Sequence, residues 1–289
     1  MSNVPSELRD DIPTFDEQPS PSSRHGPIDW TGLTSMRTAK SALEVGTIVG
    51  LALAIFFGLE AILRWTDTPT YVFPKPIDVV RVLWNEFMPV FAHHLWVTMY
   101  EFLAGFAIGA AIGLVLAALI TQKPFAEKVI APYILIMVVT PMIALVPFLR
   151  LKMGFGSWPL IIAVALASGP MVMLNSATGF RRTDLAKIAL ARSYGASTFQ
   201  IFRKIRFPLA LPMIIVGFMV GSIFGLLTAV GGEMVAPSEA GGLGERLVYY
   251  SSLARMNEFG AVIAIIAALG VGIYVLFYFI GKRWASWEA

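Results

Sequence analysis

Residues that could carry enzymatic chemistry are few in this chain. It has no cysteine and 3 histidines among 289 residues, which excludes thiolate metal sites and cysteine nucleophiles and leaves little room for a histidine-ligated metal. No Gly-x-x-x-x-Gly-Lys-Ser/Thr segment occurs, so the chain cannot bind ATP by a P-loop. The pair Gly154 and Gly156 lacks the strand and helix that a dinucleotide site needs. We therefore expect a non-catalytic chain without a metal or cofactor of its own.

Polar residues inside apolar segments point instead to a path for a solute. Thr140 and Pro141 lie in mid-segment, where a proline removes a backbone hydrogen bond and the freed carbonyl must face protein or water. Asn175 is an amide that either joins two helices or contacts the solute. Glu233 ends another apolar segment, where it either serves an outer gate or rests at the membrane interface. Together with the hydroxyl of Thr228, these residues form the predicted translocation path.

Long apolar runs must position these residues. Charged residues make up 14% of the chain, against about 25% in soluble domains, and the mean hydropathy is +0.70. A membrane-spanning helix needs about 20 apolar residues. Five uncharged runs and one that contains Glu60 predict helices at about 43–65, 95–122, 129–151, 157–180, 208–236 and 259–281. A soluble core could not enclose so many runs, so we predict an all-α membrane protein with six transmembrane helices.

Composition also predicts the domains and the orientation. Residues 1–40 are rich in proline and serine and carry an excess of acids up to Asp29, which is typical of a flexible tail. The transmembrane domain then covers 41–289. Of the Lys and Arg residues, 15 lie on the side of the N-terminus and 7 on the other side. Because positive loops stay inside, we expect the tail and both termini in the cytoplasm.

Two segments outside the membrane have helical patterns of their own. Ile77–Met88 follows Pro76 and predicts an amphipathic helix at the outer surface, with one apolar face formed by Ile77, Val80, Leu83, Trp84 and Phe87. The inner loop at 181–207 is the most basic stretch of the chain. Its Gly195 and the following Pro208 predict two short helices with a glycine turn between them.

The inner loop carries a specific resemblance. The segment from Ala189 to Gly195, followed after nine residues by Ile205 and then Pro208, resembles the Glu-Ala-Ala loop of the membrane subunits of bacterial ABC importers. In that pattern Ala191, Gly195, Ile205 and Pro208 match in register, whereas Ala189 stands where the family has Glu and Leu190 where it has Ala. The loop lies between the fourth and fifth predicted helices, where that family has its coupling helix.

The resemblance extends over roughly residues 70–289 and is strongest to the branch that serves nitrate, sulfonates and taurine. The matching pieces are Phe73-Pro74-Lys75-Pro76, His94 with Thr98, Thr140 to Pro147, Gly154-Phe155-Gly156, Asn175 to Gly179, Gly232-Glu233-Met234 and Gly242-Leu243-Gly244. This likeness implies the fold of ABC importer permeases in the bacterial inner membrane. It also implies a function, namely passage of a small solute through the membrane.

The resemblance further implies partners and contact residues. Such permeases act as pairs, here a homodimer, with two ATPase subunits that bind ATP and Mg²⁺ and with an extracytoplasmic binding protein. No nucleic acid is implied. The residues that would contact the ATPase are Ala189, Ala191, Arg192, Ser193, Tyr194, Gly195 and Ala196.

Two other classes of protein stay open as alternatives. A secondary transporter would need ion-coupling acids in the centre of the membrane, and the central apolar runs contain none. A membrane-embedded enzyme would need polar catalytic groups at one depth. The solute also stays open between a small anion and a larger neutral or aromatic compound, because no Lys or Arg lies within the five uncharged runs.

Overall fold

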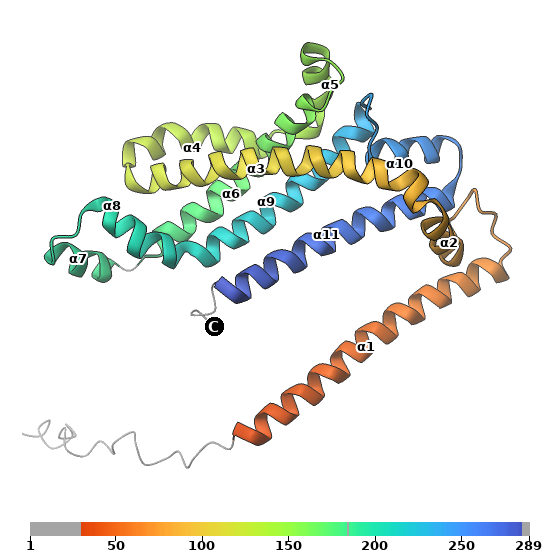
Figure 1. Cartoon of the computed structure of the whole chain (residues 1–289), viewed down its shortest axis with the longest axis horizontal. Coiled ribbons are helices and arrows are strands. Elements are labelled where there is room, and N and C mark those ends of the chain that lie inside the picture. Colours follow the sequence, from red (N-terminus) through yellow and green to blue (C-terminus); the bar gives the residue numbers. More distant parts are fainter. Residues whose placement is uncertain (1–29, 184, 285–289) are drawn as a thin grey trace, which may run out of the picture. The chain divides into compact units, whose positions relative to one another are not determined.

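The structure, a computed structural model, describes residues 30–183 and 185–284, and every regular element in this part is a helix (Figure 1). It divides into one unit up to Gly58 and a second from Leu59, and each is described by itself. Of the predicted tail at 1–40, residues 1–29 lie outside the described residues. Helix α1 covers Trp30–Trp65 and so begins earlier than expected. No proline occurs from 30 to 65, so the helix can continue beyond its apolar run.

The prediction of an all-α membrane protein is confirmed. Within the described residues, five helices are long and apolar enough to cross a membrane, and a bent pair makes six if it counts as one span. Four of the five belong to the second unit. The long helices are α1, α3 (Ala92–Gln122), α6 (Trp158–Arg181), α9 (Phe207–Val235) and α11 (Met256–Trp284). Their ends lie within a few residues of the predicted ones, except for the start of α1.

The third predicted helix is not one helix. The segment consists of α4 (Pro124–Val139) and α5 (Met142–Met153), which meet at an angle of 93°. Thr140 and Pro141 between them are both extended, with ψ angles of 124° and 95°. A proline disfavours the helical conformation of the residue before it and cannot donate to the previous turn, so both effects act at the same place. The expected helix at 129–151 is therefore corrected to two helices with a sharp break.

The core of the second unit is a close contact of α3, α6 and α9. Glycines on α3 face the backbone of α6: a Cβ atom on Gly109 would lie 2.5 Å from the Ala165 carbonyl oxygen, and one on Gly113 would lie 2.4 Å from that of Gly169. Any side chain at these positions would push the helices apart. Small residues at the contact are typical of closely packed membrane helix pairs.

The outer amphipathic helix is present as α2 (Pro76–Glu86), but its apolar face is rotated from the predicted one. Val79, Val82 and Leu83 pack against the core, whereas Val80 and Trp84 are exposed. Helix α11 lies beside α2 and provides the surface against which this face of α2 packs. A π-helical turn, η4 (Phe87–Phe91), joins α2 to α3 without a loop.

Short helices connect the long ones on both sides of the core. The inner loop contains α7 (Leu185–Ser193), α8 (Thr198–Ile201) and a π-helical turn η5 (Phe202–Arg206). This arrangement matches the two short helices expected between the fourth and fifth spans. A further helix, α10 (Leu243–Ser252), follows α9 and was not predicted. The side chains that cap its start come from α3 and α9, which are distant from it in the sequence or end before it.

Candidate functional site

The turn of the inner loop is closed by backbone hydrogen bonds. Gly195 has a positive φ of 78°, and its N–H donates to the Arg192 carbonyl oxygen at 2.9 Å. The next N–H, of Ala196, reaches back to the Ala191 carbonyl oxygen at 3.0 Å. These two bonds make a Schellman motif, in which the left-handed position favours glycine. The glycine of the sequence motif, Gly195, therefore ends helix α7 at a defined position.

The second short helix begins with a reciprocal cap. The Gln200 N–H donates to Ser197 Oγ at 3.3 Å, and the Ser197 N–H donates to Gln200 Oε1 at 2.8 Å. Such a capping box satisfies two backbone groups at a helix start. Beneath it, the Phe202 ring lies 5.2 Å from that of Phe180 at the end of α6. The loop is thus locally rigid and fixed to the inner ends of the long helices.

Three large apolar side chains of this loop are exposed. Tyr194 is 85% exposed, and Leu190 and Phe199 beside it in the chain are 60% and 69% exposed. Large apolar side chains grouped at a polar surface mark an interaction site. The predicted contact residues Ala189, Ser193 and Gly195 are also exposed, together with Arg192, whereas Ala191 and Ala196 are half-buried. Leu190 and Phe199 are not among the predicted contact residues, although two apolar residues in an otherwise basic loop are a signal that the sequence contains.

A cavity of about 290 Å³ opens at the break between α4 and α5. It brings together three of the predicted path residues, Thr140, Pro141 and Thr228. The other lining residues are Met137, Val138, Val139, Met142, Ile143, Ala167, Met171, Phe224 and Leu227. Each hydroxyl donates within its own helix, Thr140 to Ile136 O at 2.7 Å and Thr228 to Phe224 O at 2.9 Å. The two oxygens can therefore offer only acceptor lone pairs to a solute.

Two predicted path residues lie outside this cavity. Asn175 donates from Nδ2 to the Met171 carbonyl oxygen at 2.8 Å, and its Cβ would be 3.1 Å from a Cβ placed on Gly217. It thus lies at the contact of α6 with α9, which favours the packing alternative. Glu233 is 1% exposed and lies at the outer end of α9, among polar groups of other helices.

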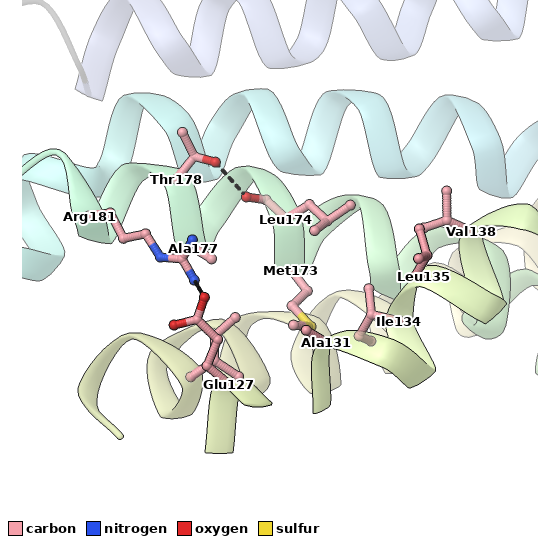
Figure 2. A pocket seen from close by; sticks show the side chains of 11 residues that line it. Glu127, Ala131, Ile134, Leu135, Val138, Met173, Leu174, Ala177, Thr178 and Arg181 are labelled. Atoms are coloured by element: carbon pink, nitrogen blue, oxygen red, sulfur yellow. Dashed lines mark hydrogen bonds and ion pairs between the residues drawn. The ribbon is translucent and has the colours of Figure 1, made fainter. Parts of the chain in front are cut away.

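An apolar groove continues inward from the break, between α4 and α6 (Figure 2). Its volume is about 410 Å³, and Val138 lines both this groove and the cavity at the break. At its inner end Arg181 donates to Glu127 at 2.7 Å, across the groove from one helix to the other (Figure 2). Both side chains are about half exposed, so this ion pair stands in solvent at the mouth of the groove.

The outer end of the core is closed by the start of α10. The Gly244 N–H donates to Glu233 Oε2 at 2.7 Å, and the Leu243 N–H donates to Thr98 Oγ1 on α3 at 2.9 Å. The glycines are required by the close approach: a Cβ atom on Gly242 would lie 2.3 Å from the Glu233 carboxyl carbon. The sequence Gly242-Leu243-Gly244 and the acid Glu233 therefore form one structural unit.

Two further charges are buried beside this unit. Glu101 on α3 is 0% exposed, and Arg150 on α5 is 1% exposed. Within the described residues, neither the Glu101 carboxylate nor the Arg150 guanidinium makes a hydrogen bond. The Arg150 charge is acted on by Glu101, Glu233 and Glu245. Arg150 is therefore a buried counter-charge to carboxylates from three other helices.

Helix α10 is held at its far end by aromatic contacts. The Tyr250 ring is 3% exposed and lies 6.3 Å from the ring of Phe91. Burial raises the pKa of the Tyr250 hydroxyl, so this residue stays uncharged at neutral pH. The Arg255 guanidinium stacks over the same ring at 5.3 Å and pairs with Glu258, which raises the pKa of Arg255. One face of α10, which carries Leu243, Leu247 and Tyr250, is therefore packed against the core.

Comparison with known proteins gives one family and a set of relatives. The family described as "Binding-protein-dependent transport system inner membrane component" matches residues 109–286. The chain is 26% identical over 241 residues to the formylaminopyrimidine transport permease protein ThiX of Halalkalibacterium halodurans, covering 82% of this chain and 92% of the relative. It is 27% identical over 256 residues to the putative aliphatic sulfonates transport permease protein SsuC of Escherichia coli, covering 88% and 93%.

Solved structures show the same fold. An inward-facing crystal form of the MetNI methionine ABC transporter contains a chain that superimposes with a TM-score of 0.59 at 22% identity. The match covers 69% of the present chain and 96% of the solved one. At this identity the likeness concerns the arrangement of helices.

Proposed function

Because this chain belongs to the family of inner membrane components of binding-protein-dependent transport systems, we propose that it forms the path for a small solute in an ATP-driven importer. The observation that carries the proposal is the inner loop. Its exposed tip of Leu190, Tyr194 and Phe199 stands on capped helices fixed to α6, and α6 contributes Ala167 and Met171 to the cavity at the break. A partner that moves the tip can therefore move one wall of the cavity.

The partners follow from this arrangement. Two ATPase subunits would each bind one inner loop of a permease homodimer, and ATP with Mg²⁺ would bind to the ATPases. An extracytoplasmic binding protein would deliver the solute to the outer face. Closure of the ATPase pair would move the loops as rigid bodies and turn the cavity outward, and hydrolysis would reset it. The chain would lie in the bacterial inner membrane with both termini in the cytoplasm.

The solute path runs along α4. From the cavity at Thr140 and Pro141 it continues past Val138 into the groove that ends at Glu127 and Arg181. Among the described residues that line the cavity, none is charged. A path of this kind offers weak apolar and hydroxyl contacts, so we assign selectivity to the binding protein. The relatives named for sulfonates and for formylaminopyrimidine differ widely in solute, which supports this division of roles.

The class of solute is a small organic or inorganic compound such as a sulfonate, taurine or nitrate. Asn175 and Glu233 would support the walls of the path, the former at the contact of α6 with α9 and the latter at the outer cap. A secondary transporter would need acids that line the path, and no acid is among the described residues that line the cavity at the break.

Assembly with an ATPase tests the proposal without knowledge of the solute. The chain is expressed with candidate ATPase subunits and purified in lipid nanodiscs, and ATP hydrolysis is measured. We expect a stable complex in which Tyr194→Asp removes ATPase binding, because a charge replaces an apolar contact. Tyr71→Asp, at an exposed position in a turn outside the long helices, is the control for the mutation type. Unchanged assembly of the Tyr194 variant, or hydrolysis by the chain alone, would contradict the proposal.

A further inference from the structure

A small polar cavity lies at the inner end of α3, under the inner loop. Its volume is about 110 Å³, and its walls come from α3, α7, α8 and η5. At roughly 30 Å³ for each water, it has room for about three or four water-sized groups. Ile188 and Ile201 form an apolar floor, since they are only 6% and 4% exposed. The cavity is separate from the solute path along α4.

Two arginines from different helices line this cavity. Arg192 comes from the last turn of α7 and Arg206 from the end of η5. The Nε atom of Arg206 is buried and has no hydrogen-bond partner among the described residues. A buried guanidinium N–H is stable only when it donates a hydrogen bond, so this atom favours an acceptor group within the cavity.

The described residues that line the cavity carry no negative charge. Thr121, Gln122 and Thr198 line the cavity, and no described carboxylate does. Ion pairs in the described part of the chain occupy Arg64, Arg81, Arg181 and Arg255. Arg192 and Arg206 are thus not neutralised by this part of the chain. Planar guanidinium groups bind tetrahedral oxyanions through paired N–H donors, which is a geometry that lysine does not offer.

We propose that this cavity binds a phosphate-type oxyanion between Arg192 and Arg206. The proposal rests on the proposed function in one respect only, namely that the inner loop faces the cytoplasm. The oxyanion is either the phosphate of an anionic lipid head group, for which the depth at the end of α3 is suitable, or inorganic phosphate from the cytoplasm. In either case it connects α7 with η5 and the end of α3, and so stiffens the inner loop.

The test titrates inorganic phosphate into the purified permease–ATPase complex in detergent and follows thermal unfolding. Ionic strength is held constant with chloride, so that general screening is equal in all samples. We expect phosphate to raise the unfolding temperature, as a ligand of the folded state does. Arg206→Gln should weaken phosphate binding by about tenfold or more, because one charged donor group is lost. Arg203→Gln, on the same turn but exposed and outside the cavity, should bind as the unmodified chain does.

A second variant and a lipid arm complete the test. Arg192→Gln removes the other guanidinium group that lines the cavity. Because Arg192 is exposed, this variant preserves folding even if the Arg206 variant does not. The same titration is repeated in nanodiscs that contain phosphatidylglycerol. If this lipid suppresses the stabilisation by added phosphate, the occupant is a lipid head group. If the stabilisation is undiminished, the occupant is free phosphate. The proposal is overturned if phosphate does not stabilise the complex, or if the Arg203 variant loses binding as much as the Arg206 and Arg192 variants do. It is also overturned if the arginine variants impair only ATPase assembly, since their partner is then a protein carboxylate.

Discussion

The Gly244 N–H donates to the Glu233 carboxylate at 2.7 Å, so the start of α10 is tied to the outer end of α9. The bond joins residues of two elements across the turn that leads from α9 into α10. On the same turn, Leu243 donates to Thr98 of α3. A side-chain acceptor from a neighbouring helix thus caps each of the first two backbone N–H groups of α10. The outer closure of the core depends on these few bonds.

Replacement of Glu233 should loosen this closure. Glu233→Ala leaves the Gly244 N–H without an acceptor and should lower the free energy of unfolding by about 1–3 kcal/mol. Glu233→Gln keeps an oxygen at the same place and should cost less. Gly244→Ala is expected to be the most harmful of the three, because its Cβ would lie 2.1 Å from the Val230 carbonyl oxygen. Thermal unfolding of the purified complex measures the order of stability of the three variants. Equal stability of the alanine and glutamine variants at Glu233 would contradict the expected order.

Arg150 should be coupled to the acids that surround it. Arg150→Gln leaves buried carboxylates without their counter-charge, which typically costs about 3–5 kcal/mol of stability. The double variant with Glu101→Gln should recover part of that loss, because both charges are then removed together. Lys152→Gln, exposed on the same helix, is the matched control and should change stability by less than about 0.5 kcal/mol. Additive losses in the double variant would show that Arg150 and Glu101 act independently.

Gly195 should be needed for coupling more than for folding. A Cβ atom at this position meets no atom within 4 Å, so the effect of a side chain is confined to the left-handed backbone. Gly195→Val should cost about 1–2 kcal/mol locally and distort the turn, whereas Gly195→Asn should be tolerated. We expect the valine variant to insert normally but to weaken ATPase binding.

Gly154→Val is the control for backbone strain at Gly195. Gly154 also has a positive φ, of 88°, and open space around it, but it follows α5 and lies far along the chain from the inner loop. The ATPase affinity of all three variants can be measured by titration in nanodiscs. Equal ATPase binding by the Gly195→Val variant and the unmodified chain would argue against a role of this turn.

The topology can be tested because the chain has no native cysteine. Ser193 at the end of α7 and Ser252 at the end of α10 are both exposed, so each can carry a single cysteine without burying it. An impermeant thiol reagent applied to intact cells should label Ser252→Cys and spare Ser193→Cys. After the membrane is opened, both should react. Labelling of both from outside would contradict the orientation derived from the positive residues.

Local features were predictable from the sequence, whereas features that depend on distant residues were not. The turn at Gly195 is encoded within one short segment, so its motif predicts it. Pro141 indicated a bend, but the angle of 93° also requires Thr140 to be extended. The burial of Glu101 beside Arg150 could not be read from spacing, because α3 and α5 meet only in the folded core. For the same reason α10 was missed, since its capping groups come from α3 and α9.

Solute uptake driven by ATP tests the central claim most directly. Proteoliposomes containing the chain, its ATPase and its binding protein are loaded with ATP on the ATPase side, and accumulation of sulfonates, taurine and nitrate is measured. We expect accumulation of one solute that requires both partners. Leu227→Trp, which fills the cavity at the break, should abolish it, whereas Leu276→Trp on an exposed face of α11 should not. Accumulation driven by an ion gradient without ATP, or unchanged uptake by the Leu227 variant, would contradict the account.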